Sequence, residues 1–140
     1  MNTGLMVMAC IVILAMTLYA QESSEKKQIS KSRLERAKKN IATGMRSTND
    51  GLMEASFILA AKMKMKYPEV PIVELKSILD SISVTNGSEA IRYKAYLSSH
   101  ICSDPDWFAT DSAVASADAE HFFPVAARRL QQKMFGMNNP

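Results

Sequence analysis

Residues 34–67 read LERAKKNIATGMRSTNDGLMEASFILAAKMKMKY, and this stretch decides the fold. Its centre, Thr48-Asn49-Asp50-Gly51, is a cluster of turn-forming and helix-capping residues. The segments on either side contain no proline, and their apolar residues recur at helical spacing. We therefore expect two helices folded back on each other. The second is the most apolar segment after residue 20, so we expect it at the centre of the core.

The first of these helices is predicted to begin near Ser30 or Ser32 and the second to end at Tyr67, because a residue before proline is disfavoured in the α region. Each should bury one stripe of apolar side chains. The expected stripes are Leu34, Ala37, Ile41 and Met45 in the first helix, and Leu52, Ala55, Leu59 and Met63 in the second.

The rest of the chain predicts three more helices. One begins around Pro71, one follows a cap at Ser88, and one runs over residues 118–135 and stops before Gly136. Their expected buried residues are Ile72, Leu75, Ile78, Leu79 and Ile82, then Ile91, Ala95, Ser98 and Cys102, then Phe123, Ala127, Leu130 and Met134. A single turn at Trp107-Phe108 and a loop over residues 109–119 complete the prediction.

Composition agrees with one all-α domain of about five helices. Of 140 residues 47% are hydrophobic, and five Gly with five Pro are too few for a turn-rich β-sandwich. A formal net charge of +3 does not indicate a nucleic-acid partner.

The first twenty residues carry no charged side chain and end in a small residue, Ala20, before the polar segment QESSEKK. This pattern predicts a cleaved secretory leader and a periplasmic or secreted protein. The alternative is an uncleaved N-terminal helix that anchors a cytoplasmic domain, because seven Lys and Arg residues follow within residues 26–39. The predicted organisation is a leader or anchor over residues 1–20, a flexible lead-in over 21–32 and a helical domain over 33–136.

The two predicted helix pairs are similar to each other. Leu34, Ala37 and Ile41 match Ile72, Leu75 and Leu79 at an offset of 38, and residues 52–58 match 91–97 at an offset of 39. This period and the polar turn that leads into the second helix at residues 48–56 resemble HEAT and armadillo repeats. The resemblance covers residues 34–102, with residues 118–135 as a capping helix. It implies a short solenoid that binds other macromolecules and implies no catalytic residue.

The sequence contains no phosphate-binding glycine loop, H-E-x-x-H, C-x-x-C or nucleophile elbow, so we expect no catalytic, cofactor or metal site. An enzyme that uses His121 with Asp118 is the alternative, and it requires both side chains in one pocket. Cys102, the one cysteine after residue 20, is expected to be a small buried residue. An intermolecular disulfide or a reactive thiol is the alternative.

Two places are candidate protein contacts. Residues 21–46 contain eight Lys and Arg but only three Glu. The candidate contact residues on this basic surface are Arg36, Lys39 and Arg46. A solvated outer face is the simpler explanation of such charge. The second candidate contact is Trp107 with Phe108. The simpler explanation of these two aromatic residues is a hydrophobic plug that fills the core. The resulting hypothesis is a protein-interaction or structural module that binds another protein, and the alternative is a membrane-anchored adaptor facing the cytoplasm.

N-terminal sequencing of the protein purified from its natural host distinguishes these two hypotheses. A cleaved leader predicts that the mature chain begins at Gln21, because signal peptidase cuts after a small residue such as Ala20. A chain that still begins at Met1 and sediments with membranes would instead establish the anchor.

Overall fold

The computed structural model describes residues 31–136, so the expectations for residues 1–30, including the leader or anchor, lie outside the described part. By its internal contacts the chain divides into two units, Met1–Ala37 and Lys38–Pro140. The described residues of the first unit, 31–37, are helical.

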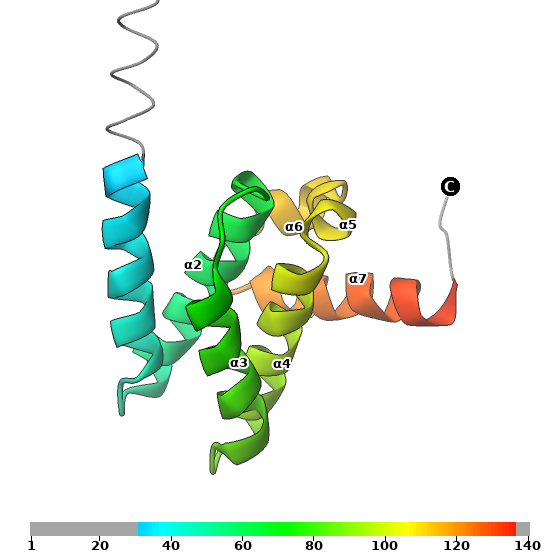
Figure 1. Cartoon of the computed structure of the whole chain (residues 1–140). Helices are drawn as coiled ribbons and strands as arrows, with labels where there is room; N and C mark the ends of the chain where they lie inside the picture. Colours follow the sequence, from blue (N-terminus) through cyan, green and yellow to red (C-terminus); the bar gives the residue numbers. More distant parts are fainter. Residues whose placement is uncertain (1–30, 137–140) are drawn as a thin grey trace, which may run out of the picture. The chain divides into compact units, whose positions relative to one another are not determined.

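Between residues 31 and 136 the structure contains helices and the turns that join them, with no strand, which confirms the predicted all-α class. A helix over residues 31–45 is followed by α2 to α7 (Figure 1). None of the helices in this part of the chain is long and apolar enough to cross a membrane. The bounds are Asp50–Lys66 for α2, Val73–Thr85 for α3, Glu89–Ser103 for α4, Pro105–Ala109 for α5, Ser112–Ser116 for α6 and Phe122–Phe135 for α7.

Local capping chemistry sets several helix ends as predicted. The Asn49 side chain accepts a hydrogen bond from the Leu52 amide at 3.0 Å, and Ser88 accepts one from the Ile91 amide at 3.4 Å. Gly136 ends α7 in the left-handed conformation with φ 62°, which glycine adopts without strain. These contacts satisfy backbone groups that have no partner inside the helix.

Helix α4 lies at the centre of the second unit. It packs against α2, α3, α5 and α7, and it runs beside α3 while α7 crosses it (Figure 1). Ile91, Ala95, Ser98 and Cys102 are buried, as the sequence predicted, and the neighbouring Leu97 and Ile101 are buried with them. Helix α3 buries Leu75 and Leu79 against it, also as predicted, with Ile72 buried just before the helix begins. The central helix is therefore α4, where the sequence had indicated α2.

The buried face of α2 differs from the prediction. Leu59 is 54% exposed, and Leu52 and Ala55 also face solvent. The buried side is centred on Phe57, which is fully buried, and the whole set is Met53, Ser56, Phe57, Ile58, Ala60 and Ala61. The apolar residues of α2 lie on almost every side of the helix. The spacing of apolar residues in the sequence therefore did not determine which side faces α4 and α5.

Two small residues, Gly44 and Ser56, determine which side of α2 is buried. A Cβ atom added to Gly44 would lie 2.0 Å from the Ser56 hydroxyl oxygen, so the two backbones approach closely at this point. Ser56 is buried, and its hydroxyl donates to the Leu52 carbonyl oxygen at 2.8 Å. A larger side chain at either position would push the helices apart.

Residues 109–119 are not the loop that the sequence predicted, because they include the short helix α6. The Asp111 carboxylate accepts a hydrogen bond from the Ala113 amide at 2.9 Å, and Val114 is fully buried. A cap at one end and one buried side chain are thus enough for a single turn of helix. In α7, Phe123 and Leu130 are buried as predicted, but Met134 is exposed.

Two substitutions test which side of α2 is inside. We expect Phe57→Ala to lower the free energy of unfolding by about 3–5 kcal/mol, because it leaves a cavity in the core. We expect Leu59→Ala to cost less than about 1 kcal/mol, because that side chain is already half in water. Urea unfolding of both variants measures the difference, and equal costs would contradict the observed face.

Candidate functional site

The three basic residues that the sequence indicated are all exposed. Arg46 is exposed and pairs with Glu74 at 3.0 Å, and Lys39 is exposed. Arg36 is exposed in the separate first unit. An exposed ion pair contributes little to stability, so the Arg46 contact is consistent with an ordinary solvated surface.

The turn at Trp107-Phe108 forms α5. Phe108 is only 1% exposed, which confirms the plug interpretation and removes this side chain from any contact surface. Trp107 is half-buried, and the guanidinium of Arg129 lies 4.1 Å from its ring centroid. A guanidinium at this distance is attracted to the ring face, so Trp107 packs within the molecule.

His121 and Asp118 lie close together but in open solvent. The ring Nδ1 of His121 is 2.8 Å from Asp118 Oδ1, and both side chains are about two-thirds exposed, 66% and 68%. The His121 amide also donates to Asp118 Oδ1 at 2.9 Å, and these hydrogen bonds lower the pKa of the carboxyl group. The pair lies in the turn that leads into α7.

Cys102 is buried, as expected. Burial raises the pKa of its thiol to about 12, so the thiolate is almost absent at neutral pH. Between residues 31 and 136 no three His, Cys, Asp or Glu side chains lie close enough to hold a metal ion together.

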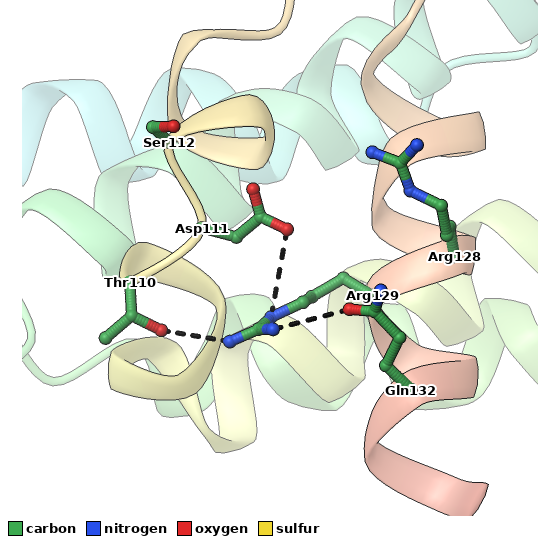
Figure 2. A pocket seen from close by; sticks show the side chains of 6 residues that line it. All are labelled: Thr110, Asp111, Ser112, Arg128, Arg129 and Gln132. Carbon is green, nitrogen blue, oxygen red and sulfur yellow. Dashed lines mark hydrogen bonds and ion pairs between the residues drawn. The ribbon is translucent and has the colours of Figure 1, made fainter. Parts of the chain in front are cut away.

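A polar hollow lies where the segment from α5 to α6 faces α7 (Figure 2). Its volume is about 440 Å³, and it opens to solvent. Side chains from both sides line it, and all of them are polar or charged. They are Thr110, Asp111, Ser112, Arg128, Arg129 and Gln132.

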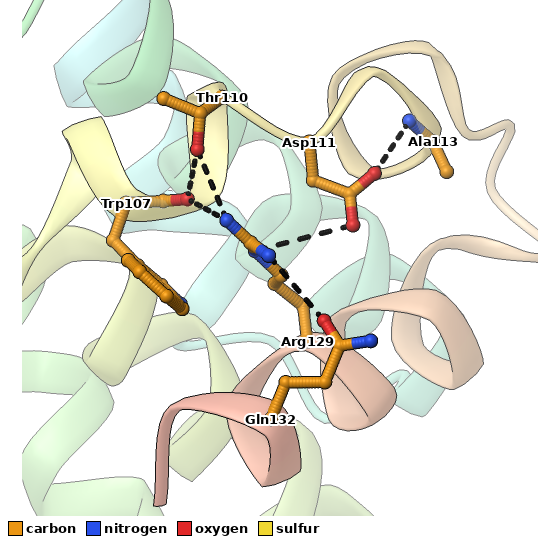
Figure 3. A network of polar contacts seen from close by, with 6 residues as sticks. All are labelled: Trp107, Thr110, Asp111, Ala113, Arg129 and Gln132. Carbon is orange, nitrogen blue, oxygen red and sulfur yellow. Dashed lines mark hydrogen bonds and ion pairs between the residues drawn. The ribbon is translucent and has the colours of Figure 1, made fainter. Parts of the chain in front are cut away.

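Arg129 holds the two sides of the hollow together (Figure 3). Its Nη2 donates to the Trp107 carbonyl oxygen at 3.1 Å and to Thr110 Oγ1 at 3.0 Å. Its Nη1 donates to Gln132 Oε1 at 3.3 Å, and its Nε lies 3.9 Å from Asp111 Oδ2. The guanidinium is thus fixed by contacts in several directions and links α7 to α5 and to the two residues that follow α5.

The preceding residue, Arg128, is not held by such contacts. It is exposed, and no hydrogen bond or ion pair to it occurs among residues 31–136. Figure 2 shows its side chain on the α7 side of the hollow, apart from the Arg129 network. Its guanidinium donors are therefore available to a ligand, whereas both Nη atoms of Arg129 already donate hydrogen bonds.

Charge complementarity explains why α7 packs here. Residues 98–120 contain five acids and no Lys or Arg, whereas α7 carries Arg128, Arg129 and Lys133. The Lys133 ammonium contacts Asp104 Oδ2 at 2.5 Å, and this hydrogen bond lowers the pKa of Asp104. Asp111 faces Arg129 in the same way. Of the three basic residues of α7, Arg128 alone is left without an acidic partner in the described part of the chain.

Sequence reasoning missed the hollow. The available signal was the acidic segment followed by two adjacent arginines, which indicated an attraction between the loop and the last helix. The pattern could not show which arginine turns inward.

No family model matches the chain, and no curated protein and no solved structure is significantly similar to it. The geometry of the hollow is therefore the basis for its chemistry. Guanidinium, hydroxyl and amide groups can bind a carboxylate or another oxygen-rich group.

The two adjacent arginines provide a matched test of the network. We expect Arg129→Met to lower the free energy of unfolding by about 2 kcal/mol, because three hydrogen bonds and the ring contact are lost. We expect Arg128→Met to change it by less than about 0.5 kcal/mol, because that side chain is exposed and makes no hydrogen bond or ion pair within residues 31–136. Urea denaturation measures both values, and a larger loss for Arg128 would contradict the assignment.

Proposed function

We propose that this chain is an exported, non-catalytic helical module that binds another protein at the hollow beside Arg128. The observation that supports this proposal is an arginine that has no partner within residues 31–136 and lies at an open polar hollow whose other arginine is fixed. Arginine is enriched among the residues that contribute most to protein–protein binding. Its planar guanidinium binds carboxylates in a defined orientation.

The chemical character of the hollow favours a protein surface as ligand. Small-molecule sites are mostly enclosed and lined by apolar side chains with a few polar groups. This hollow is open, and its lining is polar. A side chain on a partner protein can reach into such a hollow while the rest of the partner covers the rim.

The proposed architecture is a short HEAT-like scaffold. Its support is the hairpin of α3 and α4, which pack on each other, together with the repeat offset in the sequence. In such repeats the helices form a rigid frame, and the outer surfaces bind partners. Export is the second part of the proposal and rests on the uncharged residues 1–20 and the small residue Ala20. A membrane-anchored protein is the alternative, and it would place the same domain in the cytoplasm.

A site-specific photo-crosslinker tests the interaction in the host cell. Gln131 is exposed, one turn of helix from Arg128, and we expect a crosslinker there to give a discrete adduct with a second protein. The adduct should be lost in the Arg128→Glu variant. A crosslinker at Val84, which is 79% exposed on α3, is the matched control and should give no such adduct. Adducts of equal yield at both positions would refute binding at this site.

A further inference from the structure

The side of α7 that faces away from the core has a definite composition. Pro124, Arg128, Gln131 and Phe135 are spaced by four, three and four residues, and all four are exposed. The opposite side, with Phe123, Ala126 and Leu130, is buried. Helical periodicity therefore places the four exposed residues along one stripe, which we call the α7 outer face.

The α7 outer face combines a charge with an apolar end. Arg128 lies beside the hollow, and Phe135 is 70% exposed near the end of the helix, next to the exposed Met134. Seven residues at a rise of 1.5 Å separate Arg128 from Phe135 by about 10 Å along the helix axis. Arginine and aromatic residues, phenylalanine included, are enriched in protein interfaces.

We propose that the α7 outer face and the hollow bind an amphipathic helix of a partner protein that carries an Asp or Glu and, seven residues away, a large apolar side chain. A partner helix laid along α7 repeats the spacing of about 10 Å, so its carboxylate meets Arg128 when its apolar residue meets Phe135. This inference rests on the proposed function and adds the chemistry of the partner.

The charges around Arg128 favour an acidic partner. Asp111, the acid in the hollow, faces Arg129 and accepts from the Ala113 amide, and Lys133 contacts Asp104. Among the three basic residues of α7, Arg128 is thus the one whose charge has no acidic partner within residues 31–136. A single free cation is poorly suited to nucleic acid, whose binding requires several phosphate contacts.

Selection from a phage-displayed library of helical peptides tests the proposal. The target is the full domain from Gln21 to Pro140. We expect the enriched clones to carry an acidic and a large apolar residue seven positions apart. Selection against the Arg128→Glu variant should enrich Lys or Arg at the acidic position instead. A Lys39→Glu variant makes the same change of charge at another exposed position, and the acidic preference should persist there.

The affinity of one selected peptide provides the second measurement. We expect Arg128→Glu and Phe135→Ser each to weaken it at least about tenfold, and Lys39→Glu to leave it within about twofold. Circular dichroism establishes that each variant is folded. Clones that bind but are insensitive to Arg128 would overturn this inference and leave the proposed function standing. A failure to enrich any clone would overturn both. Binding of anionic lipid vesicles that depends on Arg128, or self-association through Phe135, would identify a different occupant and also overturn the inference.

Discussion

The guanidinium of Arg129 is the contact on which this end of the molecule depends. The segment between α4 and α7 has only two short helices, and few of its side chains are buried. Arg129 binds a backbone carbonyl, a hydroxyl and an amide oxygen from both sides of the hollow, and it covers the ring of Trp107. Since a guanidinium has five donors in a fixed plane, one side chain can hold α7 in register with the segment 107–111.

Much of the fold could be predicted from the sequence because several helices have one clear apolar side. In α3 and α4 the apolar residues define a single stripe, and Leu79, Ile91 and Ala95 are buried as expected. The caps at Asn49 and Ser88 are local, so a few residues determine them. The same reasoning failed for α2, whose apolar residues surround the helix. There the choice of buried side depended on the close approach at Gly44 and Ser56, which is a tertiary contact.

The candidate site could not be predicted in the same way. Arg128 and Arg129 are neighbours of identical type, and successive residues of a helix point about 100° apart, so the register of α7 alone gives them different environments. The basic residues that the sequence indicated are exposed, whereas the acidic segment that the sequence predicted to be a loop supplies the partners for α7. The charge pattern of the sequence indicated that the acidic segment and α7 attract each other. The packing of α7 determines that Arg129 is engaged and that Arg128 is left without an acidic partner within residues 31–136.

The way α7 is attached affects its dynamics. Helix α4 is surrounded by other helices, whereas α7 packs against α4 and α6 and projects its last turn, with Met134 and Phe135, into solvent. A helix held along one side opens at a lower free energy than the centre of the protein, so its amide hydrogens exchange with solvent earlier than those of α4. Any ligand seated on that helix would suppress this local opening, and amide protection along α7 would report occupancy directly.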